Sequence, residues 1–299
     1  MDRQKLIGHA MMTFTVFMWG IEYIAAKFAL TAFSAMTIIM LKYCIASFIL
    51  GGYKFFTGQR GFIKRKDILT FLFVAVLGEL LYFYCEYSAM DYLPVGLVTV
   101  VLALVPVASI ITERIFFGRK PTVKMIIGII ACLGGIVLII GVDLEQVLSG
   151  QFIGYLFCLM AVCCWNAYNF ITEKIGEDYS DANLTFNQMV SALILCSPLG
   201  IAQFPGFAVF EDWRVLFGIL FLGIMSAGIG FLFYVSSLKR LGPTIMSVYS
   251  NFMPVTTAFF GWVILKEYLS PMQLLGMAIV IAAGLLVILD KSRLDDADK

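Results

Sequence analysis

Four ionisable side chains interrupt stretches of sequence that are otherwise apolar. Glu22, Lys42, Glu79 and Glu86 each lie inside a long hydrophobic run within the first 90 residues. An ionisable group at the centre of a bilayer costs about 2.5–3.5 kcal/mol on insertion scales, so each one needs a partner or a use. Because Glu22 and Glu79 outnumber Lys42, the spare carboxylate is expected to take up a proton or to hold a cation.

Helix geometry places three of these groups at a similar depth. With a rise of 1.5 Å per residue, Glu22 lies roughly 22 Å from the inner surface, Lys42 roughly 12 Å below the outer one and Glu79 roughly 18 Å from the inner end of its helix. All three then fall in the outer half of the membrane. A purely structural alternative is that Lys42 neutralises one carboxylate and braces its helices. Glu86 lies near the outer boundary, where simple solvation is an alternative to a binding role.

Aromatic and amide side chains accompany the acids. Residues 79, 82, 83 and 86 follow i, i+3, i+4, i+7 spacing and form one face of a helix, and Trp19 and Glu22 share another face. Aromatic rings beside carboxylates suit ammonium or guanidinium groups, although packing is the alternative for any single ring. The predicted substrate-binding residues are Trp19, Glu22, Glu79, Tyr82, Phe83, Trp165, Asn166, Asn169, Tyr249 and Asn251. The predicted coupling and charge-pair residues are Glu22, Lys42, Glu79 and Glu86.

Two prolines fall in the middle of apolar runs. Pro106 and Pro254 each free a carbonyl in the preceding turn, which predicts a helix kink. Such a kink either shapes the helix or turns a carbonyl oxygen toward a ligand.

The composition is that of a membrane protein. Hydrophobic residues make up 61% of the 299 residues and charged residues 14%, with a mean hydropathy of +0.93. Soluble domains are about 45–50% apolar and about 25% charged. The net charge of +1 gives no reason to expect a nucleic-acid partner. The apolar residues form ten blocks, long enough for helices and too uninterrupted for barrel strands: 7–29, 35–56, 68–90, 94–117, 122–142, 152–174, 182–204, 214–238, 243–265 and 271–290. The sequence therefore predicts an all-α integral membrane protein with ten transmembrane helices.

Charge placement and an internal repeat predict the topology. Most of the 21 basic residues fall on the inner side if the N-terminus is cytoplasmic, which predicts a multi-pass protein of the plasma (inner) membrane with both termini cytoplasmic. Ser88, Leu93 and Pro106 recur 148 residues later, and Trp19 recurs 146 residues later as Trp165. Residues 1–146 and 147–299 are therefore predicted to be two five-helix repeats with inverted topology. The charged tail 291–299 is expected to be disordered.

The order of several short motifs resembles a known family. These motifs are Trp19-Gly20 with Lys27, Leu41-Lys42-Tyr43, Tyr84 with Tyr92-Leu93, Pro106-Val107, Pro254-Val255 and Lys266-Glu267 with Gly276 and Ala283-Gly284. Over nearly the whole chain they resemble the EamA-type branch of the drug/metabolite transporter superfamily. The resemblance implies a ten-helix carrier with a central cavity lined mainly by helices 1, 3, 4, 6, 8 and 9. The chain departs from the family pattern at Lys42, where Arg is common, and at Glu22, a position usually small or neutral. It also lacks the Glu that follows helix 4, at Gly118-Arg119.

These features favour a secondary active transporter that works by alternating access. The predicted cargo is a small polar metabolite with an amine or cationic group, such as an amino acid or organic cation, and protons are the predicted coupling ion. The alternative is an uncoupled or exchange-type exporter of neutral or amphipathic metabolites or drugs, including nucleosides and amino acids. A remote alternative is an intramembrane enzyme. The sequence lacks the features expected of one: paired intramembrane aspartates, a set of metal ligands and a G-x-S-x-G motif. No cofactor or metal is expected, the partners are substrate and lipid, and the chain is expected to be a monomer or homodimer.

Overall fold

The regular structure of the chain is helical throughout the part that is described. The computed structural model describes residues 3–59, 61–93, 98, 101–118, 120–140, 152–265 and 270–297, with main chain only at 265 and 291–297. No strand occurs in these ranges. This confirms the predicted all-α membrane fold.

The helices follow the predicted blocks closely. The first half contains α1 (Arg3–Leu30), α2 (Ala35–Phe56), α3 (Ile68–Val74), the π-helix η2 (Ala75–Leu81), α4 (Tyr82–Ala89), α6 (Val105–Phe116) and α7 (Val123–Ile140). The second half contains α9 (Phe152–Gly176), α10 (Asp181–Ala202), α11 (Trp213–Phe221), the π-helix η4 (Leu222–Gly230), α12 (Phe231–Ser250), α13 (Met253–Leu265) and α14 (Pro271–Ala297). Short 3₁₀ turns precede α3 and α11, at η1 (Arg65–Asp67) and η3 (Phe207–Glu211).

Several helices can cross a bilayer by length and composition. Six continuous helical stretches among the described residues meet both criteria, and 123–139 and 253–264 are shorter apolar helices. Large apolar side chains lie on the outside of the bundle, such as Phe48 with 86% of its surface exposed. Such residues are suited to contact with lipid, so the exposed apolar surface needs no protein partner.

α12 joins the eighth and ninth predicted blocks across a sharp bend. Gly242 has φ +76°, a left-handed conformation that a side chain would strain, and Pro243 follows it. The residues before Gly242 continue the helix that begins at Trp213, and those after it run toward α13. The bend therefore marks the boundary that the sequence places between the two blocks.

Local features of the first half recur in the second half. Ser34 caps the N-terminus of α2, and Ser180, 146 residues later, caps α10. The π-helices η2 and η4 occupy matching positions. The chain also turns out of helical geometry at 103–104 and 251–252, just before Pro106 and Pro254, so each proline starts a new helix. The predicted division at 146/147 lies outside the described residues and stays a prediction.

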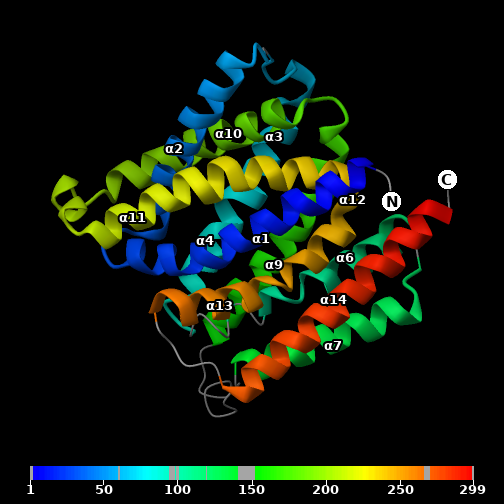
Figure 1. The fold of residues 1–299 in the computed structure, drawn as a ribbon. Helices are drawn as coiled ribbons and strands as arrows, with labels where there is room; N and C mark the ends of the chain where they lie inside the picture. Colours follow the sequence, from blue (N-terminus) through cyan, green and yellow to red (C-terminus); the bar gives the residue numbers. More distant parts are fainter. Residues whose placement is uncertain are drawn as a thin grey trace.

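The two chain ends lie on the same side of the bundle (Figure 1). We call this the terminal side and the opposite one the far side. α2 and α10 pack antiparallel and exchange matching bonds at their ends: Ser34 on the far side donates to Gln203 (2.6 Å) and Ser180 on the terminal side donates to Gln59 (3.0 Å). These paired bonds tie the two halves together on both sides.

The tail prediction was wrong for most of its length. α14 continues past the apolar block to Ala297. Residues 291–297 contain no Gly or Pro to end the helix, and Lys, Arg, Leu and Ala favour helical conformation. Charge alone therefore did not make this segment disordered.

α7 and α14 lie side by side, apart from the bulk of the bundle (Figure 1). Their closest approach is made by glycines. A Cβ on Gly276 would lie 2.6 Å from the backbone oxygen of Gly135 and 2.9 Å from the nitrogen of Ile139. Small residues at a helix crossing permit backbone contact, so this pair depends on having no side chain there.

We expect Gly276→Ala to destabilise the protein by about 1–3 kcal/mol, because the new methyl group overlaps backbone that cannot move aside easily. Thermal unfolding of the detergent-solubilised protein measures the effect. Gly134→Ala is the matched control, since a Cβ there meets nothing within 4 Å. Equal unfolding temperatures for the two variants would contradict the proposed close packing.

Candidate functional site

Lys42 is the centre of a buried charged cluster. It lies on α2 with no exposed surface, and its Nζ is 3.5 Å from Oε1 of Glu22 on α1. The same ammonium lies 3.0 Å from the centroid of the Phe83 ring and donates to the Tyr87 hydroxyl at 3.5 Å. A carboxylate and an aromatic face therefore share the single cation.

Glu22 is also held by the second half of the chain. Ser226 in η4 donates to its Oε2 at 2.6 Å. Ion pairs and hydrogen bonds thus reach this carboxylate from α2 and η4. The contact with Ser226 was not predicted, because the sequence gives no signal that the π-helix η4 faces the Glu22 carboxylate.

Glu86 is buried rather than solvated. Only 4% of its surface is exposed, and its Oε1 accepts hydrogen bonds from Tyr23 and Tyr82, each at 3.0 Å. The solvated alternative for this residue is therefore wrong. Tyr82 lies one turn earlier on α4, whereas Tyr23 reaches across from α1.

Glu79 completes the cluster from within the π-helix η2. It has no exposed surface, and the hydroxyl of Tyr43 donates to its Oε2 at 2.5 Å. Its Oε1 has no hydrogen-bond partner in the described part of the chain. The wide turn of a π-helix displaces a side chain from its regular position, a feature common at functional sites.

The structure brings all four predicted coupling residues together. Lys42 interacts electrostatically with Glu22, Glu79 and Glu86. Three carboxylates face one ammonium in a place shielded from water. Uncompensated charge in such a place is costly, so the arrangement can accept protons or an additional cation.

Two adjoining cavities border this cluster. The first is lined by Glu22 and Glu86 among aromatic rings, and the second extends it toward the interruptions before Pro106 and Pro254. Both are lined by Trp19, Tyr23, Tyr82, Trp165 and Met253. Their walls therefore come from α1, α4, α9 and the fourth and ninth predicted segments. The eighth predicted segment contributes to the first cavity indirectly, because its Ser226 donates a hydrogen bond to Glu22 on the cavity wall.

The aromatic side chains of the cavities contact one another. The ring centroid of Trp165 is 4.6 Å from that of Tyr82 and 5.8 Å from that of Trp19. Tyr23 was missed by the sequence analysis, although it lies four residues after Trp19, where a helix brings side chains to one face. Phe83 lines the first cavity on one side and covers Lys42 on the other.

The predicted polar residues of the second half lie apart from these cavities. Asn166 faces α6, where its Oδ1 accepts from Ser109 (2.9 Å) and its amide donates to Thr112 (2.7 Å). Asn169 is fully buried and accepts from Tyr234 at 2.6 Å.

Tyr249 and Asn251 also lie elsewhere. The Tyr249 hydroxyl and His9 Nδ1 are 2.8 Å apart, beside an apolar groove between α1, α13 and α14. Asn251 is fully buried at the interruption before α13.

Pro254 borders the second cavity, whereas Pro106 is not among the residues that line either one.

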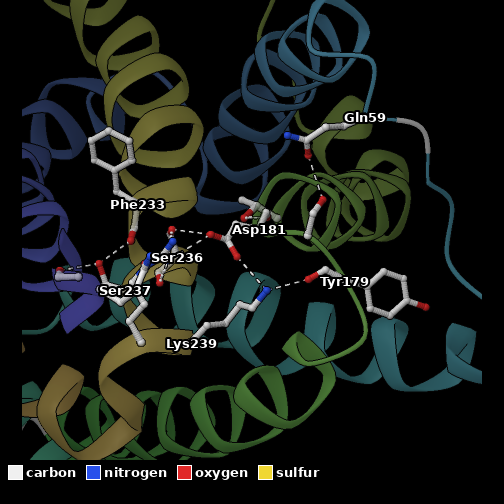
Figure 2. A network of polar contacts seen from close by, with 12 residues as sticks. Gln59, Tyr179, Asp181, Phe233, Ser236, Ser237 and Lys239 are labelled. Atoms are coloured by element: carbon white, nitrogen blue, oxygen red, sulfur yellow. Dashed lines mark hydrogen bonds and ion pairs between the residues drawn. The ribbon is translucent and has the colours of Figure 1, made fainter. Parts of the chain in front are cut away.

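A polar network lies on the terminal side of the bundle (Figure 2). Asp181, the first residue of α10, accepts from Lys239 (2.8 Å), Arg240 (3.2 Å) and Ser236 (2.5 Å) of α12. Lys239 also donates to the backbone oxygen of Tyr179 at 2.7 Å. The network therefore joins α12 to the connection between α9 and α10.

The first half of the chain extends this network. The hydroxyl of Tyr179 donates to Asp67 at 2.8 Å, and Asp178 pairs with Lys64 (3.3 Å) and Lys66 (3.4 Å). Hydrogen bonds from these two lysines lower the pKa of the Asp178 carboxyl below its ordinary value. The acid is exposed, so these pairs contribute little stability.

Comparison with known proteins gives consistent results over most of the chain. The model of the EamA-like transporter family matches residues 6–141 and 152–289. An uncharacterised transporter of Archaeoglobus fulgidus is 25% identical over 92% of this chain and 96% of its own length. The threonine/homoserine exporter RhtA of Escherichia coli K12 is 26% identical over 91% of this chain and 89% of its own.

A solved structure shares the fold. Its match has a TM-score of 0.76 with 17% identity, and it covers 96% of this chain and 99% of the other. The family and both relatives bear the names of transporters rather than of enzymes.

We expect Lys42→Met to destabilise the protein by about 3–5 kcal/mol, because it leaves the Glu22 carboxylate buried without its cation. The double variant Lys42→Met/Glu22→Gln removes both charges and is expected to recover part of that loss. Chemical denaturation in detergent measures both. Additive losses in the double variant would contradict a direct interaction between the two side chains.

Proposed function

We propose that this chain, which belongs to the EamA-like transporter family, carries a small amine-bearing or cationic metabolite across the membrane by secondary active transport. Membership of the family makes it a multi-pass membrane transporter and not an enzyme. The observation that carries the proposal is the pairing of Glu22 and Glu86 with aromatic rings on the wall of one buried cavity. Acid and aromatic groups together suit a positively charged ligand.

The geometry of the first cavity supports an ammonium ligand. Glu22 and Glu86 come from α1 and α4, so a cation between them would meet carboxylates from two helices. Tyr82 and Trp165 offer ring faces beside these acids. A cation over an aromatic face gains about 0.5–2 kcal/mol, with the larger value where water is excluded.

Proton coupling follows from the surplus of acid in the cluster. Glu79 is fully buried, is not among the residues that line either cavity, and accepts a hydrogen bond from Tyr43. Its position suits a group that exchanges a proton, while Glu22 and Glu86 contact the cargo. Entry of a cation between the acids then favours release of a proton from the same cluster.

Alternating access is the mode of transport that the repeats favour. Residues 1–146 and 147–299 would act as two inverted units that move relative to each other about the Trp19–Trp165 pair. The excess of Lys and Arg on the terminal side favours a cytoplasmic location for both ends. The far side would then face the outside of the cell at the plasma membrane.

A relative favours a second candidate within the same class. RhtA is named as an exporter of threonine and homoserine, and its match covers most of both chains. Amino acids carry an ammonium group, so the same acids could bind them. In this version the protein would export an amino acid, by exchange or without a coupling ion.

A ligand screen followed by flux measurement tests the proposal. Primary amines, quaternary ammonium compounds, amino acids and nucleosides are added to the purified protein, and a ligand at 100 times its Kd should stabilise the fold by about 2.7 kcal/mol. The best ligand is then tested for saturable counterflow in proteoliposomes. Stabilisation by nucleosides alone would contradict the proposed cation site.

We expect Glu22→Gln and Glu86→Gln each to lower transport of the cationic ligand at least tenfold, since each removes a carboxylate from the cavity wall. Uptake into proteoliposomes over a range of pH measures this. Glu177→Gln, an exposed acid after α9, is the matched control. Unchanged transport in both cavity variants would show that these acids do not bind the cargo.

A further inference from the structure

One polar pair of the first half has a counterpart in the second half. Tyr23 of α1 donates to Glu86 of α4 at 3.0 Å. With the offset of 146 residues seen at Trp19 and Trp165, the counterpart of Tyr23 is Asn169 of α9. With the offset of 148 seen in the next repeat segment, the counterpart of Glu86 is Tyr234 of α12. The hydroxyl of Tyr234 donates to Asn169 at 2.6 Å, so the same two positions are bonded in both halves.

A second pair repeats in the same way. Glu22 and Lys42 are 3.5 Å apart, and their counterparts at an offset of 146 are Tyr168 and Gln188. The hydroxyl of Tyr168 donates to Gln188 at 3.3 Å. The contacts are conserved between the halves, but the charged groups of the first are neutral in the second.

The two sets lie on either side of the tryptophan pair. Trp19 and Trp165 are themselves counterparts, and their ring centroids are 5.8 Å apart. Within α1, Glu22 and Tyr23 lie beyond Trp19 toward the far side. Within α9, which runs the opposite way, Tyr168 and Asn169 lie beyond Trp165 toward the terminal side. The charged set is therefore on the far side and the neutral set on the terminal side.

Only the far-side set borders the cavity that holds Glu22 and Glu86. Glu22, Tyr23 and Glu86 line that cavity and keep 4–7% of their surface exposed. The counterparts Tyr168, Asn169 and Tyr234 have no exposed surface at all. The contact between α9 and α12 is thus closed at these residues, and the Asp181 network holds α12 against the start of α10 (Figure 2).

We infer that the hydrogen bond between Tyr234 and Asn169 is the gate that keeps the terminal side closed, the counterpart of the bond between Tyr23 and Glu86. The inference rests on the proposed alternating access and assigns residues to one step of it. Opening this gate separates α12 from α9 beneath the Trp19–Trp165 pair. The groups that it uncovers are themselves neutral, and Glu79 is the carboxylate that interacts with Tyr168 and Tyr234 from the charged cluster.

Hydrogen exchange measured by mass spectrometry tests the gate without any ligand. In Tyr234→Phe, which keeps the ring and removes the hydroxyl, amides of 166–176 and 231–241 are expected to exchange at least tenfold faster, while those of 82–89 do not. The Tyr234 hydroxyl also interacts with Trp165, so Asn169→Leu is a second variant that removes only the acceptor. Both single variants and the double variant should give the same increase, because they break one bond.

Two tyrosine variants are matched controls. Tyr155→Phe removes a hydroxyl that has no hydrogen-bond partner among the described residues and should exchange like the unmodified protein. Tyr23→Phe breaks the far-side bond and should not speed exchange at 231–241. Faster exchange on both sides in Tyr234→Phe, or none at either, would overturn the gate assignment.

The outcome is independent of the cargo. A terminal-side opening in Tyr234→Phe supports the gate even if no cation is transported, and the substrate proposal alone would then fail. Cation transport with unchanged exchange in Tyr234→Phe and Asn169→Leu would keep the substrate proposal and overturn the gate.

Discussion

The cost of burying unbalanced charge is the constraint on which the site depends. Glu22, Glu79 and Glu86 surround one ammonium inside a helical bundle, and tyrosine and serine hydroxyls donate to all three acids. Hydroxyl donors lower the cost of each carboxylate but leave the total charge unbalanced. This imbalance is the basis for the proposal that the acids exchange protons or a cation. A membrane protein that needed only stability would have little use for them.

The repeat explains how one chain builds this site on one side only. The halves share caps, π-helices and interruptions before Pro106 and Pro254, so the backbone frame is nearly the same twice. The side chains that differ between halves decide the chemistry: acids and a lysine in one, tyrosine and amides in the other. We propose that this similar backbone with unequal side chains gives the two sides different affinity for a cation.

Much of this could be predicted from the sequence. The lengths of the apolar blocks predicted the helices, because backbone N–H and C=O groups in lipid must find hydrogen-bond partners within their own segment. Helix rise predicted that Glu22, Lys42 and Glu79 lie at similar heights, and the structure brings Lys42 into interaction with both acids. The direction in which each side chain points around its helix axis was harder to predict. Asn166, Tyr249 and Asn251 are polar residues at suitable depths, yet they face α6, His9 and the interruption before α13, because packing between helices sets their direction. The partners Ser226 and Tyr43 depend on π-helical turns, for which sequence patterns carry no clear signal.

The central claim is that this cluster holds more negative charge than it can keep, and infrared spectroscopy of the ligand-free protein tests it most directly. At neutral pH we expect the carbonyl stretch of a protonated carboxyl group in a buried setting, and its loss in the double variant Glu79→Gln/Glu86→Gln. A spectrum in which every buried glutamate is ionised at neutral pH would contradict it.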